Sequence, residues 1–182
     1  MENSFYSPTE LSELGFKSYG KNVLISRLAR FYSLSTIEIG DNVRIDDFCI
    51  ISGHIKLGNY IHISAYTALY GKFGIEMSDY SGLSPRCTIF SASDDFSGDF
   101  LIGPMIDSRF TNVTGGKVSI GKYSQLGCNC TVLPGIIINE GVAVGALSLV
   151  TSDLQEWSIY KGIPAKFYKL RSKKLLELKI QK

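Results

Sequence analysis

The sequence lacks the features that mark several protein classes. Its 182 residues include four cysteines and two histidines. Because no two cysteines form a C-x-x-C pair, neither a zinc knuckle nor a small disulfide framework is indicated. No apolar run approaches the roughly 20 residues of a membrane span, and residues 1–5 have neither the basic nor the apolar region of a signal peptide. We therefore expect a cytoplasmic protein of a reducing compartment, with no membrane span.

Charge is also scarce, at 20% of the residues with a net charge of +2, while 45% are hydrophobic. This composition suits one globular domain and not a nucleic-acid-binding protein. The charge is uneven, because residues 166–182 contain a single acid, Glu177. Seven basic residues share that segment: Lys166, Lys169, Arg171, Lys173, Lys174, Lys179 and Lys182. The leucines spaced among them predict an amphipathic C-terminal helix.

A repeat with a period of six residues dominates the rest of the chain. One run of aliphatic residues is Ile39, Ile45, Ile51, Leu57, Ile63, Leu69 and Ile75, and a second is Ile120, Leu126, Val132, Ile138, Val144 and Val150. Four places after each lies a second register of mostly small or β-branched residues, from Val43 and Cys49 to Phe73, and again from Ser124 and Cys130 to Leu154. A helix needs a period of 3.6 and a hairpin strand a period of two, so neither explains this spacing.

A period of six is typical of a parallel β-helix. Each hexapeptide forms a short strand and a corner, three of them close one triangular coil, and stacked coils bury a continuous aliphatic column. We predict an all-β fold in which Cys49 and Cys130 are reduced core residues. A short helix after Ser7-Pro8-Thr9-Glu10 covers the open first coil, since these residues match a capping box with proline at the first helical position.

The single domain is expected to have five parts. These are an N-terminal cap (1–19), the first coils (20–90), a protruding loop (91–117), the last coils (118–156) and a C-terminal extension (157–182). The loop is indicated by the loss of the period between Cys87 and Lys117, and long loops inside compact domains are usually functional.

The repeat, the loop and three short motifs resemble the hexapeptide-repeat acyltransferases. The motifs are Leu133-Pro134-Gly135, Gly145-Ala146 and the Gly-Ile-Pro-Ala-Lys segment at 162–166. The resemblance covers about residues 20–171 and includes both the galactoside, maltose and xenobiotic acetyltransferases and the enzymes that N-acylate nucleotide-linked amino sugars. It implies a left-handed β-helix, a homotrimer with active sites between neighbouring subunits, and acetyl-CoA as the co-substrate without a metal. It also implies a CoA-binding set: Gly127, Ala146, Thr151, Lys161, Lys166 and Arg171, with Lys173 as a second possible phosphate contact.

The catalytic loop departs from the pattern of this family. In the O-acetyltransferases the loop carries a histidine base, but here the matching run, residues 89–95, has Asp94 in the histidine slot. A hydroxyl acceptor needs a base near neutral pH, whereas a neutral amine needs only positioning and a proton acceptor. We therefore predict Asp94 as the base, with Asp95 and Asp99 as neighbouring carboxylates. The alternative for these residues is an Asx-turn on an exposed loop.

The predicted acceptor-binding residues are Arg86, Ser84, Tyr66 and Tyr70, with Tyr80 as a further aromatic candidate, because aromatic faces stack on sugars and arginine pairs with diphosphates. The function expected is acyl transfer from acetyl-CoA to the amino group of a nucleotide-linked amino-deoxysugar used for surface polysaccharide or O-antigen lipopolysaccharide. The alternatives are O-acetylation of a saccharide hydroxyl and, more remotely, a non-catalytic β-helix scaffold. A zinc site of three histidines is excluded by the two histidines present.

Overall fold

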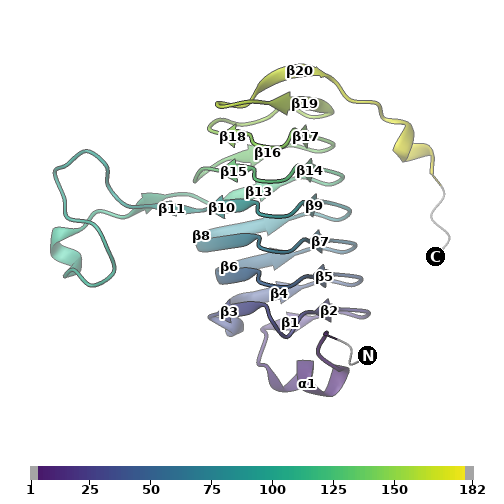
Figure 1. The fold of residues 1–182 in the computed structure, drawn as a ribbon, viewed down its shortest axis with the longest axis horizontal. Helices are drawn as coiled ribbons and strands as arrows, with labels where there is room; N and C mark the ends of the chain where they lie inside the picture. The colour runs from purple at the N-terminus through teal and green to yellow at the C-terminus, as the bar shows by residue number, and fades with distance from the viewer. Residues whose placement is uncertain (1–3, 179–182) are drawn as a thin grey trace.

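A computed structural model describes residues 4–178, and its architecture is a stack of triangular coils joined by parallel strands (Figure 1). One side of the triangle is the eight-stranded sheet, which also includes the terminal hairpin: β2 (Leu24–Ile25), β5 (Arg44–Ile45), β7 (His62–Ile63), β9 (Gly82–Leu83), β14 (Gln125–Leu126), β17 (Ala143–Val144), β19 (Ser158–Lys161) and β20 (Lys166–Leu170). No helix within the described residues is long and apolar enough to span a membrane.

The ten-stranded sheet forms the other two sides of the triangle. Its strands are β1 (Ser18–Tyr19), β3 (Arg30–Tyr32), β4 (Ile37–Ile39), β6 (Ile50–Leu57), β8 (Ala68–Met77), β10 (Thr88–Phe90), β13 (Val118–Ile120), β15 (Thr131–Val132), β16 (Ile137–Ile138) and β18 (Leu149–Val150). Strands β6 and β8 are long enough to continue from one side to the next, and their pairing shifts register between Gly53 and Ile55.

The thirteen aliphatic residues of the two predicted runs all lie in the core, none more than 4% exposed. Hydrogen bonds between coils place them in vertical columns; Ile45 pairs with Ile63, Ile63 with Leu83, and Leu126 with Val144. The column is therefore the physical cause of the period of six, because every sixth side chain points into the same interior.

The register differs from the prediction in one coil. Ile75 pairs with Ile55, and Met77 takes the place opposite Leu57, so this coil is two residues longer than the one before it. The period then continues through Met77, Leu83 and Ile89, which are buried although the sequence pattern did not assign them to the run. The same insertion removes Phe73 from the second register, because Ile75 takes the place opposite Ile55, and the side chain of Phe73 is 44% exposed.

The N-terminal helix α1 (Pro8–Glu13) confirms the predicted cap. Ser7 and Glu10 form the reciprocal capping box, and Leu11 is the helix's buried residue. A 3-10 turn, η1 (Leu34–Thr36), separates β3 from β4 in the irregular first coil.

The C-terminal extension does not form the predicted amphipathic helix within the described residues. Its chain returns as strand β20, antiparallel to β19, and only a short 3-10 turn follows, η3 (Lys174–Glu177). The hairpin between the two strands docks on β18, since Leu149 donates its N–H to the carbonyl of Gly162 and Ala165 donates to that of Leu149. Backbone pairing with the last coil therefore overrides the helical pattern. Lys179, Ile180 and Lys182 lie outside the described residues.

The predicted protruding loop is present and leaves the coils on a narrow antiparallel stalk (Figure 1). The stalk pairs β11 (Ala92–Ser93) with β12 (Thr114–Gly115), and the loop beyond it contains one 3-10 turn, η2 (Ser108–Phe110). It extends to the side opposite the eight-stranded sheet, so residues on the loop and on β9 are far from each other in one chain.

Candidate active site

Three vertical edges join the sides of the β-helix, and they organise the candidate residues. We call the edge that follows β9, β14 and β17 the Ser84 edge (Tyr66, Ser84, Arg86, Gly127 and Ala146). The edge from which the loop departs is the loop edge (Tyr70, Lys72 and Ser91). The third, the Tyr80 edge, holds Tyr60, Tyr80, Tyr123 and Trp157, whose rings stack in sequence with centroids 4.7, 5.4 and 6.2 Å apart.

Asp94 lines a cavity of about 580 Å³ between the protruding loop and the loop edge. The opposite wall includes Tyr70, whose ring stacks on that of Phe90 with centroids 5.3 Å apart. The side chain of Asp94 is exposed, and within the described residues its carboxylate accepts no hydrogen bond and forms no ion pair. A carboxylate that is held at a cavity wall but is not engaged by the protein is available to a substrate cation.

Asp95 and Asp99 have different surroundings. The carboxylate of Asp95 accepts hydrogen bonds from the backbone and hydroxyl of Ser97 and from the side-chain amide of Asn112. The hydrogen bond from the Ser97 hydroxyl is the largest cause that holds the pKa of Asp95 below its usual range. Asp95 therefore forms the Asx-turn that was the alternative reading, and neither it nor the exposed Asp99 lines the cavity.

The Ser84 edge brings together most of the predicted acceptor and CoA residues. Arg86 lies over the ring of Tyr66 at 5.4 Å, and Tyr66 stacks on Phe48 at 4.9 Å. Strand pairing of Leu83 with Leu126, and of Leu126 with Val144, places Ser84, Gly127 and Gly145 one above another. Tyr70 is separate from this group because it belongs to the loop edge.

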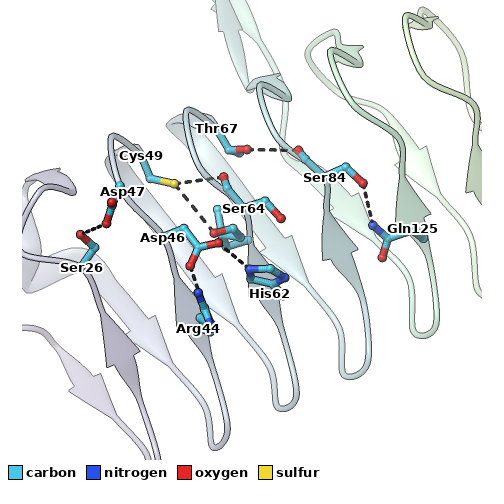
Figure 2. Close-up of polar contacts among 11 residues, drawn as sticks. Ser26, Arg44, Asp46, Asp47, Cys49, His62, Ser64, Thr67, Ser84 and Gln125 are labelled. Carbon is cyan, nitrogen blue, oxygen red and sulfur yellow. Dashed lines mark hydrogen bonds and ion pairs between the residues drawn. The ribbon is translucent and has the colours of Figure 1, made fainter. Parts of the chain in front are cut away.

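Ser84 has a partner that the sequence pattern did not reveal. The side-chain amide of Gln125, in the next coil, donates to the Ser84 hydroxyl at 3.2 Å (Figure 2). Gln125 reaches across Gly82, where a Cβ would lie 2.7 Å from the glutamine oxygen. The only sequence signal for this contact is the pairing of Gln125 with Gly82, which requires the register of the coils to be known.

The predicted CoA residues do not all lie on one edge of the β-helix. Gly127 and Ala146 lie on the Ser84 edge, and Lys161 continues the same column, because β17 pairs with β19. Lys166 lies opposite Lys161 in β20. Thr151 follows β18 at the top of the loop edge, one side of the triangle away.

The backbone N–H groups on the Ser84 edge differ in availability. The N–H of Gly127 donates to the carbonyl of Val144 at 2.8 Å and is therefore committed to the coil. The N–H of Ala146 donates no hydrogen bond within residues 4–178. Of these two predicted CoA-binding residues, Ala146 is therefore the one whose backbone N–H is left open.

Arg171 lies on the Tyr80 edge, away from the other predicted CoA residues. Its Nη1 donates to the carbonyl oxygens of Tyr123 at 2.7 Å, Gly141 at 3.0 Å and Val142 at 3.3 Å. Burial lowers the pKa of Arg171. Lys173 lies on the same edge, 5.4 Å from the ring of Trp157.

A polar cluster occupies the lower coils on the same side as Ser84. Asp46 accepts a hydrogen bond from Arg44 at 2.7 Å and lies 2.7 Å from Nε2 of His62 (Figure 2). Burial opposes ionisation of Asp46, but these two partners together hold its pKa below the usual value. Among residues 4–178, no group of three or more histidine, cysteine or acidic side chains is arranged to hold a metal ion.

The chain matches no protein-family model. It is 46% identical, over 178 residues, to a dTDP-4-amino-4,6-dideoxy-D-glucose acyltransferase of Escherichia coli, covering 96% of this chain and 93% of the relative. Solved structures of AntD, an N-acyltransferase from Bacillus cereus, superpose with a TM-score of 0.94. One of them, a variant bound to dTDP-4-amino-4,6-dideoxyglucose and coenzyme A, is 50% identical and covers 97% of this chain and 95% of its own. Another contains dTDP and 3-hydroxybutyryl-CoA, with the same identity and TM-score.

A maltose O-acetyltransferase from Clostridium difficile matches more distantly, with 21% identity, a TM-score of 0.58 and coverage of 91% of this chain and 75% of its own, and this likeness shows the fold alone. The architecture is a left-handed parallel β-helix, and the similarity to these relatives over nearly the whole chain makes the protein a CoA-dependent acyltransferase. The chain belongs to the family of N-acyltransferases that act on nucleotide-linked amino-deoxysugars.

Proposed function

We propose that this enzyme transfers the acyl group of acetyl-CoA or a related acyl-CoA to the 4-amino group of a dTDP-linked 4-amino-4,6-dideoxyhexose. The Escherichia coli relative is a dTDP-4-amino-4,6-dideoxy-D-glucose acyltransferase, and a structure of AntD contains dTDP-4-amino-4,6-dideoxyglucose. The observation that carries the proposal for this chain is the unengaged carboxylate of Asp94 at the cavity wall, in the place where O-acetyltransferases have a histidine. A carboxylate suits an amine acceptor better than a hydroxyl, because an amine can attack before it loses a proton.

The reaction forms a bond between the sugar nitrogen and the thioester carbon and breaks the bond between that carbon and sulfur. The attacking nitrogen becomes cationic, and Asp94 stabilises that charge and accepts the proton. The proton then leaves with the CoA thiolate, which regenerates the carboxylate. The carbonyl oxygen gains negative charge in the intermediate, and the open N–H of Ala146 is the backbone donor proposed to meet it.

We also propose a homotrimer with each active site shared between two chains. In one chain Asp94 projects from the loop edge, whereas Ser84 and Arg86 lie on another edge, with the side of the triangle that contains β10 between them. A second copy that presents its Ser84 edge to the loop would bring both sets to one acceptor. Three chains of 20.1 kDa make about 60 kDa, and light scattering on the purified protein tests this mass; a monomer at assay concentration would contradict it.

For CoA, we propose that the pantetheine arm follows the Ser84 edge past Gly127 and Ala146. Lys161 and Lys166 then lie near the nucleotide end of CoA, and Thr151 is contributed by a neighbouring edge. Lysine ammonium groups suit phosphate oxygens as point charges. We do not assign Arg171 to CoA, because its guanidinium is engaged on a different edge. We propose the cytoplasm as the site of action and a surface polysaccharide such as lipopolysaccharide as the destination of the product.

The test is acyl-CoA turnover with a dTDP-linked 4-amino-4,6-dideoxyhexose, compared with the corresponding hydroxyl sugar nucleotide and with free saccharides. Only the amino substrate should be acylated, and activity confined to hydroxyl acceptors would replace the proposal with O-acetylation. Asp94→Asn should lower kcat on the order of 10²-fold, as for loss of a general base, while the Kd of CoA stays unchanged. Glu13→Gln, which removes an exposed carboxyl on α1, serves as the matched control. Wild-type turnover in Asp94→Asn would refute the role of this residue.

A further inference from the structure

A second cavity continues the Asp94 cavity toward the N-terminal coils. It has a volume of about 380 Å³ and is lined by Ser52, Gly53, His54, Tyr70, Lys72 and Ala92. Tyr70, Lys72 and Ala92 line both cavities, so the two meet at these side chains. Together they form a passage from the reactive carboxylate down the loop edge to His54. Volumes of this size are typical of small-ligand sites.

Lys72 stands where the two cavities meet, and it is the lysine of this region without an acidic partner. Within residues 4–178, no carboxylate lies within 4.0 Å of its ammonium group, which lies over the ring of Phe73, 6.0 Å from the ring centroid. The neighbouring lysines on the outer surface of the adjacent side are paired: Lys17 with Glu38 at 2.7 Å, Lys56 with Glu76 at 3.4 Å, and Lys117 with Glu76.

The difference between Lys72 and its paired neighbours affects the electrostatic potential in the cavities. Exposed lysines next to carboxylates lower the electrostatic energy of the surface by a small amount, as surface ion pairs do. An ammonium group that lines a cavity without a carboxylate leaves a positive potential there, which favours an anion. Among residues 4–178, Asp94 is the only acidic side chain that lines either cavity, and it lines the larger one.

We propose that Lys72, with His54 below it, binds the diphosphate of the nucleotide-linked acceptor. This inference rests on the proposed function, and it adds that the diphosphate of the acceptor lies along the loop edge of the chain that supplies Asp94. With the sugar amine at Asp94, the diphosphate is the next charged group along the substrate. Lys72 meets it with charge-assisted hydrogen bonds. The ring of Tyr70, which stacks on Phe90, lines both cavities and forms the wall against which the deoxyhexose packs.

The diphosphate is thus assigned to Lys72 and not to Arg86, the residue that the sequence pattern suggested. Arg86 lies on the Ser84 edge over the ring of Tyr66, and it lines neither cavity. If Arg86 of a neighbouring chain held the diphosphate instead, Lys72 could be replaced without loss of nucleotide affinity. The two residues therefore give opposite results in a binding experiment.

The experiment measures the Kd of dTDP by titration calorimetry on the intact protein, since dTDP contains the diphosphate but neither the sugar nor the amine. Lys72→Met should weaken dTDP binding about 10- to 100-fold, as expected for the loss of a hydrogen bond to a charged group. Lys72→Arg should restore most of the affinity. Lys56→Met is the matched control, because its partner Glu76 keeps Lys117 and neither lysine lines these two cavities.

The Kd of CoA, measured on the same samples, reports whether each variant is folded and assembled, and it should not change. Wild-type affinity of Lys72→Met for dTDP would overturn the inference, as would a loss seen in Arg86→Met but not in Lys72→Met. These results differ from failure of the proposed function, which would appear as a wild-type enzyme that does not acylate the amino-sugar nucleotide at all.

Discussion

The side-chain amide of Gln125 donates a hydrogen bond of 3.2 Å to the hydroxyl of Ser84, and it reaches that hydroxyl across the bare backbone of Gly82. The contact joins two successive coils, because Gly82 and Gln125 are direct partners in the parallel ladder between β9 and β14. If Ser84 touches the acceptor, as we propose, Gln125 sets the direction of its hydroxyl and acts as a positioning residue.

Gln125→Ala should reduce kcat/KM for the acceptor about fivefold, the effect of losing one neutral hydrogen bond worth about 1 kcal/mol. Gly82→Ala should act in the same direction, because its methyl group would displace the glutamine oxygen. Steady-state kinetics at saturating acyl-CoA measure both effects. Gln155→Ala removes an exposed glutamine from the last coil and should have no effect. Unchanged kinetics in both Gln125→Ala and Gly82→Ala would remove Gln125 from the site.

Arg171 joins the returning C-terminal strand to the Tyr80 edge through three carbonyl oxygens. Arg171→Met should lower the free energy of unfolding by about 1–3 kcal/mol, since hydrogen bonds from a charged donor are lost, and should leave the KM for acyl-CoA unchanged. Chemical denaturation and steady-state kinetics are the measurements, with the exposed Lys174→Met as the control. A higher KM for acyl-CoA with unaltered stability would instead place Arg171 at the cofactor.

The four cysteines are free, and they should differ in reactivity. Cys49, Cys87 and Cys130 are buried, and Cys128 is partly exposed. Burial raises the pKa of Cys49 to about 11, so little of its thiolate exists at neutral pH. A thiol reagent at pH 7.5 should therefore modify Cys128 first in the folded protein and all four in denaturant. Mass spectrometry of the labelled peptides measures the order, and rapid labelling of Cys49 would contradict the described core.

Glu10 ties α1 to the first coil through Arg27. The hydrogen bond from the Arg27 guanidinium, followed by those from Ser7, lowers the pKa of Glu10 from 4.5 to about 2. A carboxyl with a depressed pKa contributes stability that is fully present above pH 4.5 and is lost as the pH falls toward 2. The protection factors of the amides in residues 7–14, corrected for the intrinsic pH dependence of exchange, should therefore fall as the pH decreases from 4.5 to 2.

Glu10→Gln provides the control for that pH dependence. The amide cannot ionise, so the variant should show faster exchange of α1 at pH 7 than the wild type and no further pH dependence from this position. Identical exchange profiles for the two proteins would show that the Glu10–Arg27 pair does not hold the helix in solution.

Much of the fold follows from the spacing of residues along the chain. Every aliphatic residue of the two runs from Ile39 and Ile120 is buried, and the capping box at Ser7 and Glu10 begins a helix as expected. These features depend on local chemistry and on one repeating contact, which a sequence displays directly. The coil with two extra residues before Met77 was missed, because Ile75 satisfies the period of six while it occupies the second register.

The site was only partly accessible to the same reasoning. Asp94 is predicted from its slot in a family pattern and stays a prediction. The competing roles of Asp95 and Arg171 were decided by contacts with Ser97, Asn112 and three carbonyl oxygens, which no spacing predicts. Gln125 and Lys72 were not predicted, because the role of each depends on its surroundings. Gln125 needs Gly82 in the coil below, and Lys72 needs the absence of an acidic neighbour.

The sequence by itself therefore determined the β-helix, the place of the protruding loop and the identity of the loop carboxylate, because all three are expressed at fixed distances along one chain. The tertiary structure alone decided which residues share an edge, since stacking brings together side chains that are about one coil, or one whole loop, apart in sequence. Because of this stacking, Asp94 and Ser84 lie on different edges of one chain, Lys72 lies beside the cavity, and Arg171 lies on the Tyr80 edge.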